Sequence, residues 1–456
     1  MTTSRADRCT FIPPWLVERV DGPERAAADE ALRRERAARA GVRPEPAPLE
    51  GAVAAAAWTV HDAGSSTSLP GTPARRAGEP ATGDPAVDEA ATGIEATLLM
   101  FLDDLGRDSY DDAGAPVSLT VHYGSRYNNA FWDGTQLVFG DGDGRVFERF
   151  TKPVDVLAHE FSHAVVERTA GLTYEGQSGA LNESVADAFA SCLKQRLLGQ
   201  DAAEADWLIG EGIFLPRVRA RALRDLAAPG TAYDDPEIGA DPQVAHLDDY
   251  VETTDDNGGV HLNSGIPNKA FQLAAVAIGG RAIEGAGRIW YDALVGGDVP
   301  SGATFATFAA ATVAAAGEHA DAVREAWAQV GVEPARAGAV VPPPSTSPST
   351  SPSAPASEPV VAGGRLRVER SGGFVGRTEA AEVDLDPADP DLGRLVTEAV
   401  LGSASTDGPP RPDMFVYTFT VDDRAPVRVP EHLLTASQAE LASRVLRPGA
   451  DAGWEG

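Results

Sequence analysis

The segment Val156–Phe189, VLAHEFSHAVVERTAGLTYEGQSGALNESVADAF, carries the most specific pattern in the chain. His159 and His163 are four residues apart in it. On an α-helix this spacing places both imidazoles on one face, about one turn apart, where they can bind one metal ion. Glu160 lies beside that face, where a carboxylate can act on a water molecule without binding the metal. The spacing predicts a metal site, although a pair of ordinary histidines is the alternative.

A second helical stretch in the same segment offers further candidate ligands. Glu183 and Asp187 are also four residues apart, so they share one face of that helix. Glu183 would complete a set of three ligands, and three protein ligands with one open position are typical of catalytic zinc. Asp187 is expected to accept the remaining ring N–H of a ligating histidine, with an ordinary solvated helix face as the alternative.

Charge and composition exclude several classes of partner. The chain has 456 residues, with 38 Lys and Arg against 68 Asp and Glu, and a formal net charge of -30. Such a surface repels phosphate backbones, so we expect no nucleic-acid partner. No apolar run is long enough to predict membrane insertion. The start of the chain lacks the apolar run of a signal peptide, so we expect synthesis in the cytoplasm, with a non-classical route for any export.

Sequence patterning divides the chain into several units and predicts an α+β fold. Short β-rich runs with turn signals precede the histidine helix, and segments with helical periodicity follow it. GDGDG, at 140–144, reads as a hairpin turn rather than a calcium loop. The expected units are an N-terminal segment (1–50) containing a helix at 22–40, a β-rich lobe with the histidine helix (51–190), a helical lobe (191–337), a Pro/Ser/Thr-rich linker (338–363) and a small α+β or β-rich domain (364–456). Helices are expected at 154–168, 180–198, 264–278 and 305–330.

Three stretches in order resemble the thermolysin family of zinc metallopeptidases. They are HEFSHAVVERTAGLTYEGQSGALNESVAD, in which the third ligand follows the second histidine by twenty positions, YNNAFWDG (Tyr127–Gly134) and DNGGVHLNSGIPNKAF (Asp256–Phe271). The motifs IPPWL and PGTAYDDPEIGADPQ resemble the protealysin-like branch of that family. The resemblance spans about residues 57–332 and implies a two-lobe fold, β-rich and then α-helical, with the zinc helix between the lobes. It also implies a neutral endopeptidase that is made as a precursor.

The resemblance implies a role for each matching residue at the metal. His159, His163 and Glu183 would bind Zn²⁺, and Glu160 would be the general base. A zinc scaffold without activity is the weaker alternative, because every expected chemical residue is present.

Further roles follow from the flanking motifs. Tyr174 and His261 would donate hydrogen bonds to the developing oxyanion, and Asp256 would orient His261. Loss of either donor would then lower kcat more than it raises KM.

The same resemblance implies a substrate groove. Asn129 and the backbone of Ala130 would pair with the main chain of a protein or peptide substrate, and Arg224 would hold a substrate carbonyl. The family's apolar pocket, here including Val156 and Leu223, implies cleavage on the amino side of hydrophobic residues.

One departure from the family concerns calcium. Lys194 stands where calcium-binding members carry a carboxylate, and a lysine opposes a divalent ion. Asp155 remains acidic, but one acid beside a lysine forms an ion pair more easily than a calcium site. Calcium is therefore not expected.

Both ends of the chain suggest regulation from within the molecule. Residues 1–50 resemble the short precursor segment of protealysin-like enzymes, which folds on the catalytic domain and is removed by self-cleavage. Cys9 in this segment is a candidate zinc ligand, with simple burial as the alternative. RVERSGGFVGR (Arg367–Arg377) and the strand MFVYTFTV resemble emfourin, a protein inhibitor of protealysin-like enzymes. The C-terminal domain is accordingly expected either to inhibit the enzyme or to dock it on a partner.

Overall fold

The computed structural model describes two compact units, which divide at residue 344. The described residues are 10–22, 57–335, 365–372, 377–384, 396, 415–421, 427–430 and 436–446. Cys9, most of the helix expected at 22–40 and the linker expected at 338–363 lie outside these residues.

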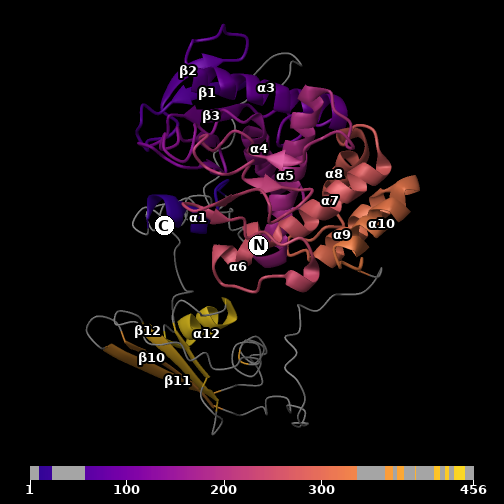
Figure 1. Cartoon of the computed structure of the whole chain (residues 1–456). Coiled ribbons are helices and arrows are strands. Elements are labelled where there is room, and N and C mark those ends of the chain that lie inside the picture. Colours follow the sequence, from indigo (N-terminus) through magenta and orange to yellow (C-terminus); the bar gives the residue numbers. More distant parts are fainter. Residues whose placement is uncertain are drawn as a thin grey trace. The chain divides into compact units, whose positions relative to one another are not determined.

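A mixed sheet forms the β-rich lobe of the first unit (Figure 1). Its strands are β1 (Trp58–Asp62), β2 (Thr72–Arg76), β3 (Val117–Val121), β4 (Ala130–Trp132) and β5 (Leu137–Phe139), in the order β2-β1-β3-β5-β4. β1 runs parallel to β3, and β3 parallel to β5, whereas β4 pairs antiparallel with β5. Strand β4 is therefore an edge strand, whose outer backbone groups can pair with another segment of chain.

A long helix that the sequence reading missed interrupts this lobe. Helix α3 (Pro85–Leu105) begins after Asp84, whose side chain accepts hydrogen bonds from two N–H groups of the first turn, and it ends at the left-handed Gly106. These capping residues are readable in the sequence, because Asp before Pro starts helices and Gly ends them. The helix packs against α4 (Val154–Arg168) so closely that a Cβ on Gly93 would lie 3.0 Å from Leu157.

The hairpin expected at 140–144 is wrong. Strand β5 enters this glycine-rich loop, but no paired strand leaves it. Asp143 Oδ1 instead accepts N–H groups of residues 145, 146 and 147. The chain then turns toward the helical lobe, where the Glu148 N–H binds the carbonyl of Ile213 at 2.8 Å. The residues that follow the loop therefore pair with the helical lobe and not with β5.

His122, which follows strand β3, forms ion pairs with Asp141 and with Asp84 at the start of α3. His122 Nδ1 lies 2.9 Å from Asp141, and His122 Nε2 lies 3.1 Å from Asp84. The hydrogen bond and charge of Asp141 outweigh partial burial and raise the pKa of His122 to about 9.

The second lobe is helical, as expected. Its elements are α5 (Gly176–Leu198), α6 (Asp256–Asn263), α7 (Gly265–Ile278), α8 (Arg288–Val295), α9 (Phe305–Ala315) and α10 (Ala320–Gln329), with two short hairpins, β6 (Leu208–Ile209) with β7 (Arg224–Asp225) and β8 (Asp234–Asp235) with β9 (Gly239–Ala240). One continuous helix was expected at 305–330, but Gly317, with φ of +53°, separates α9 from α10. None of the described helices is long and apolar enough to cross a membrane.

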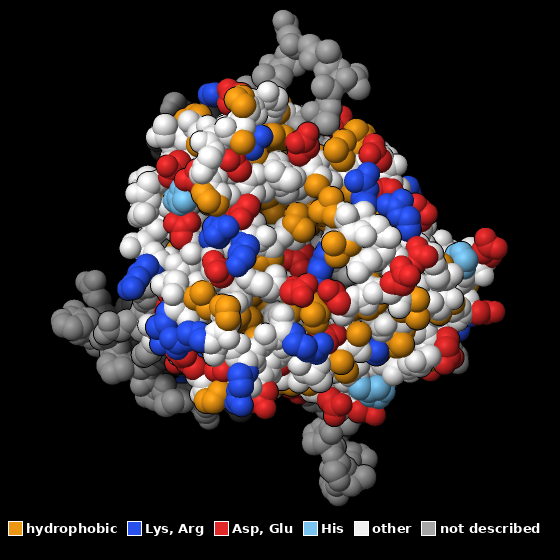
Figure 2. Space-filling view, turned by 45° about the horizontal axis from the view of Figure 1, so that its top comes forward, with side chains coloured by type: hydrophobic (Ala, Val, Ile, Leu, Met, Phe, Trp, Pro, Cys, Tyr) orange, Lys and Arg blue, Asp and Glu red, His pale blue; other side chains and the backbone are white. Residues whose placement is uncertain are grey.

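The helices α4 and α5 lie at the centre of the first unit (Figure 1). The core joins both lobes through them, since Phe161 on α4 and Phe189 on α5 each contact Phe101 of α3 with ring centroids 5.3 Å apart. Residues Val156 to Val166 of α4 are all buried. Every polar side chain in that stretch therefore needs a partner inside the protein. On the face shown in Figure 2, acidic and basic side chains are interspersed over the surface.

The second unit is a small α+β domain. Its antiparallel sheet has the order β11-β10-β12-β13, and one helix, α12, packs on it. The elements are β10 (Arg365–Gly372), β11 (Arg377–Asp384), β12 (Phe415–Val421), β13 (Val427–Pro430) and α12 (Ala436–Leu446). Leu366, Val368 and Phe419 from the sheet and Leu441 from the helix form its apolar core. The strand expected within MFVYTFTV is thus present as β12, and the domain is α+β, one of the two classes expected.

Candidate active site

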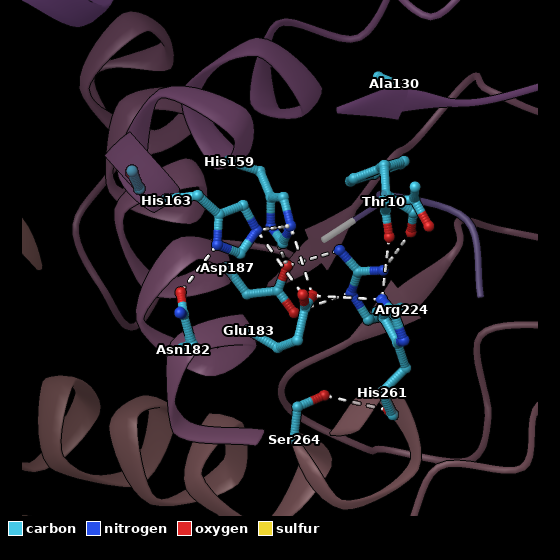
Figure 3. Close-up of polar contacts among 12 residues, drawn as sticks. Thr10, Ala130, His159, His163, Asn182, Glu183, Asp187, Arg224, His261 and Ser264 are labelled. Atoms are coloured by element: carbon cyan, nitrogen blue, oxygen red, sulfur yellow. Dashed lines mark hydrogen bonds and ion pairs between the residues drawn. The ribbon is translucent and has the colours of Figure 1, made fainter. Parts of the chain in front are cut away.

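Helices α4 and α5 bring the three predicted metal ligands together (Figure 3). The Nε2 atoms of His159 and His163 lie 2.9 Å apart, and the carboxylate of Glu183 lies 3.4 Å from His159 Nε2 and 3.6 Å from His163 Nε2. One ligand atom from each residue lies within 4.8 Å of the others, and all three residues are buried. The two histidines spaced four residues apart on α4, and Glu183, twenty positions after the second of them, thus direct their side chains to one point.

Each histidine is oriented by an oxygen behind it. His159 Nδ1 donates to Asp187 Oδ1 at 2.9 Å, and His163 Nδ1 donates to Asn182 Oδ1 at 2.8 Å. Both Nε2 atoms consequently point at each other and at Glu183. Such backing oxygens fix the tautomer and orientation of metal-binding histidines. The role of Asn182 was missed, because nothing in the sequence tells which residue of the next helix will face His163.

The electrostatics of this cluster fit a cation. Burial disfavours charge on His159, but the hydrogen bonds to Asp187 and Glu183 outweigh it and raise the pKa of His159 to about 9. Burial and the neighbouring charge of His159 lower the pKa of His163 to about 4. The carboxylates of Asp187 and Glu183 thus favour positive charge at the neighbouring imidazoles. A divalent ion bound at this point would meet ligands of the type zinc prefers.

Asp187 links the metal cluster to the helical lobe. Besides His159, it accepts two hydrogen bonds from Arg224, at 2.8 Å from Nε and 2.7 Å from Nη2, and one from Asn268 Nδ2 at 2.9 Å. Burial works against its charge, but Arg224 and His159 lower the pKa of Asp187 to about 2. Arg224 therefore lies at the predicted site. Asn268 was missed, although it belongs to the matching stretch NSGIPNKAF.

Glu160 has the surroundings of a general base. It is fully buried, and neither carboxylate oxygen accepts a hydrogen bond from another side chain among the described residues. Burial raises the pKa of Glu160 to about 7, with the charge of His159 opposing the shift. A carboxyl group that titrates near neutral pH can both accept and return a proton.

Tyr174 and His261 both lie close to Glu183 of the cluster. The Tyr174 hydroxyl donates to Glu183 and lies 3.4 Å from His261 Nε2. His261 Nδ1 in turn donates to Asp256 Oδ1 at 2.7 Å, and the His261 N–H donates to Asp256 Oδ2 at 2.9 Å. Asp256 and Asn257 have φ of +53° and +51° in a left-handed turn that brings the carboxylate back onto the ring. Burial opposes charge on His261, but Asp256 and Glu183 raise its pKa.

The N-terminal segment fills the groove beside these residues. The Phe11 N–H donates to the carbonyl of Ala130 on the edge strand β4, at 3.0 Å. Ile12, the residue after Phe11, forms two hydrogen bonds with the side chain of Asn129. Asn129 Oδ1 accepts the Ile12 N–H at 2.8 Å, and Asn129 Nδ2 donates to the Ile12 carbonyl at 3.2 Å. The sequence indicated that this segment lies on the catalytic domain, but not that these residues enter the groove.

Two carbonyls of the segment are bound from the helical lobe (Figure 3). The Phe11 carbonyl accepts a hydrogen bond from Arg224 Nη1 at 3.1 Å. The preceding carbonyl, that of Thr10, lies 2.9 Å from His261 Nε2. His261 therefore donates to the carbonyl immediately before Phe11.

The Phe11 side chain occupies a buried pocket. Its ring makes an edge contact with His159, with centroids 5.2 Å apart, and the Arg224 guanidinium lies 4.7 Å from its centre. Gly210 forms part of the wall, because a Cβ there would lie 3.3 Å from the Phe11 ring and 3.2 Å from Leu223. Phe11 has no exposed surface. The site thus accommodates a large apolar side chain.

Lys194, on α5, forms ion pairs with two carboxylates that follow this helix in the chain. Its ammonium lies 2.8 Å from Asp206 and 2.9 Å from Glu211. The sequence reading paired it with Asp155, but Asp155 Oδ2 instead accepts the N–H of Gly210 at 3.0 Å. The pairing with Asp155 was therefore wrong, because two other carboxylates come closer to the lysine.

Comparisons with known proteins agree with this geometry. Family models described as thermolysin metallopeptidase, catalytic domain and alpha-helical domain, match residues 60–167 and 170–332, and the Emfourin model matches residues 368–446. An extracellular metalloprotease of Pectobacterium carotovorum subsp. carotovorum is 46% identical over 335 residues, covering 71% of this chain and 96% of the relative. A thermolysin of Alicyclobacillus acidocaldarius subsp. acidocaldarius is 40% identical over 241 residues, covering 50% of this chain and 42% of the relative.

A solved structure shows the same fold. The precursor of protealysin, a metalloproteinase from Serratia proteamaculans, is similar at a TM-score of 0.63 and 46% identity, covering 71% of this chain and 99% of that one. The match to a precursor agrees with a site in which an N-terminal segment lies in the groove. The chain belongs to the thermolysin metallopeptidase family, is similar to protealysin, and carries an emfourin domain at its C-terminal end.

Proposed function

We propose that the enzyme is a zinc endopeptidase that cuts proteins on the amino side of hydrophobic residues. The observation that carries this proposal is the peptide already in the groove: main-chain contacts from Asn129, Ala130 and Arg224 hold it, and Phe11 fills the pocket. Main-chain contacts of this kind bind any extended peptide, whereas a pocket selects the side chain. The residue in the pocket would be the one that contributes the nitrogen of the bond that is cut.

His159, His163 and Glu183 would hold the zinc ion. When bound, zinc supplies Lewis acidity that polarises the substrate carbonyl and makes a water molecule more acidic. Glu160 takes a proton from the attacking water and passes it to the leaving amine nitrogen. Its buried position and a pKa of about 7 suit both transfers.

Tyr174 and His261 act on the oxygen that gains charge. His261 already donates to a peptide carbonyl at 2.9 Å, and Asp256 fixes the ring by accepting from its other nitrogen. A donor aimed at a developing oxyanion lowers the barrier more than it strengthens substrate binding. Asn129 and Ala130 orient the substrate as an added strand, and Arg224 holds the carbonyl of the pocket residue itself.

The Glu160→Gln protein tests the mechanism. It should keep zinc, because Glu160 is not a ligand, and should lose at least about a thousandfold in kcat on a peptide substrate. Glu167→Gln is the matched control on the same helix, where an oxygen remains for the Trp132 indole that now donates to Glu167 at 2.9 Å. Parent-level hydrolysis by zinc-loaded Glu160→Gln would refute this role for the carboxylate.

The emfourin domain is proposed to inhibit the catalytic unit of the same chain. Support comes from the match to the Emfourin model over residues 368–446. The extracellular metalloprotease of Pectobacterium carotovorum is almost fully covered by a match to 71% of this chain, so the rest of this chain is additional to that relative's length. A tethered inhibitor acts at a high effective concentration, so even weak occlusion would be effective. Docking on a partner is the alternative function of this domain.

Matured enzyme with and without the domain separates the two functions. A chain that ends at residue 337 should hydrolyse a small peptide faster than the chain that ends at residue 456, and purified domain added back should slow it. Equal rates together with no effect of added domain would leave docking as the function.

A further inference from the structure

The N-terminal segment is bound in the register proposed for a substrate. The Phe11 N–H reaches Ala130 at 3.0 Å, and Asn129 holds both the N–H and the carbonyl of Ile12. None of these contacts depends on the side chains of the segment. The segment therefore uses the same groups that would hold any extended peptide along the edge of β4.

This register places one peptide bond at the reacting position. The carbonyl of Thr10 accepts from His261 at 2.9 Å, and the next carbonyl, that of Phe11, accepts from Arg224 at 3.1 Å. The side chain between these two carbonyls is the one in the pocket. The Thr10–Phe11 bond consequently lies where the proposed function requires the bond that is cut, with a hydrophobic residue on its amine side.

We propose that the Thr10–Phe11 bond of this chain is a self-cleavage site; the inference rests on the proposed peptidase function. The oxygen of a water molecule bonds to the carbonyl carbon of Thr10, and the bond from that carbon to the Phe11 nitrogen breaks. Glu160 carries one proton from the water to that nitrogen, and the second proton of the water ionises from the new carboxyl group and passes to the amine. The products are a carboxylate on Thr10 and an ammonium group on Phe11, and water is the only other reactant.

The cut is slow compared with turnover of an external substrate. Thr10, Phe11 and Ile12 have no exposed surface, so attacking water has limited access. A peptide held this firmly before reaction also gains little further binding in the transition state. The segment therefore acts as an inhibitor that is itself consumed.

The cut leaves the groove filled. Beyond the segment, helix α1 (Pro14–Asp21) buries Leu16 and Val17, and Asp21 accepts a hydrogen bond from Asn128 at 2.8 Å. Arg145 adds a contact to the carbonyl of Val20 at 3.3 Å. These anchors lie after the cut bond, so residues from Phe11 onward stay in place at first. Activity on other proteins therefore follows the cut only after these residues have left the groove.

Intact mass and N-terminal sequencing of the full chain test the proposal. Metal-free protein is loaded with zinc and sampled over time, and hydrolysis of an added peptide is followed in parallel. A fragment of residues 1–10 and a new N-terminus at Phe11 should appear before peptide hydrolysis does. The rate should stay the same on tenfold dilution, because the reaction is within one molecule.

The outcomes distinguish this inference from the proposed function. Hydrolysis of the added peptide while no N-terminus at Phe11 appears would overturn the inference alone. Absence of both reactions in the full chain and also in the chain that ends at residue 337 would overturn the peptidase function and the inference with it. A rate that scales with concentration would overturn cleavage within one molecule.

Two variant comparisons complete the test. Phe11→Ala empties the pocket and should slow the cut at this bond by at least about tenfold, whereas Phe11→Leu should keep it within about threefold. In zinc-loaded Glu160→Gln protein the segment should stay whole, with slow hydrogen exchange at the Phe11 and Ile12 amides. Asn129→Ala in that background should speed exchange at Ile12. Fast exchange at both amides before the second substitution would contradict the bound register without reference to activity.

Discussion

Replacing Asp187 with asparagine tests whether one carboxylate holds both the metal ligands and the lobes in place. Asp187 accepts four hydrogen bonds within 2.9 Å, from His159, Asn268 and two nitrogens of Arg224, and it is completely buried. Asparagine keeps the shape but offers one acceptor oxygen, and its amide N–H₂ group faces N–H donors. The Arg224 guanidinium, 3% exposed, would lose its counter-ion.

The magnitude follows from that geometry. Removing one partner of a buried ion pair costs about 3–5 kcal/mol, and an asparagine that keeps part of the hydrogen bonding should fall near the lower end, at about 3 kcal/mol. Loss of the oxygen behind a ligating histidine lowers metal affinity by about 10- to 100-fold. Both effects are expected from the same substitution.

Urea unfolding of the metal-free protein measures the first effect, since no self-cleavage occurs without metal. Titration in zinc-buffered solution measures the second. Asn182→Ala is the control, because Asn182 backs His163 with a neutral side chain and should cost only about 1 kcal/mol. This account of Asp187 would be refuted if the Asp187→Asn protein stayed within about 1 kcal/mol of the parent in stability and within about threefold in zinc affinity. These limits are of the order of experimental error.

Three further substitutions address other features of the first unit. Lys194→Met removes the partner of two carboxylates and should lower the free energy of unfolding by about 1 kcal/mol. This difference from the parent should largely disappear in 1 M NaCl. An unchanged urea midpoint would contradict the prediction. The pKa of His122 is raised to about 9, chiefly by Asp141, so its ion pairs stabilise the fold fully below about pH 6.5 and lose this effect as pH rises through 9. The free energy of unfolding should therefore fall by about 1 kcal/mol between pH 6 and pH 10, and the His122→Asn protein should lack this fall. Gly210→Ala, in the wall of the Phe11 pocket, should shift peptide cleavage from Phe toward smaller residues, and an unchanged ratio of kcat/KM values for Phe and Ala peptides would show that Gly210 does not limit the pocket.

Local spacing determined the candidate metal ligands. The prediction that 154–168 forms one helix is confirmed to the residue, and the faces of α4 and α5 follow from the period of 3.6 residues. Helix α3 was equally readable from Asp84 and Gly106, so missing it was a failure of interpretation rather than of the signal. The break at Gly317 was also local, since glycine takes a positive φ at low cost.

Contacts between distant segments could not be read from the chain. Asn182 faces His163 only because α4 and α5 pack at one particular rotation, and Glu148, which follows the loop at 140–144, donates to Ile213 of the other lobe. The sequence by itself determined which side chains could bind a metal and which family the chain resembles, because those patterns depend on neighbours along one helix. Only the tertiary structure decided that Thr10 meets His261 across 251 positions. Hydrogen bonds over such a separation form only once both lobes have packed, and they put this chain's own Thr10–Phe11 bond at its candidate active site.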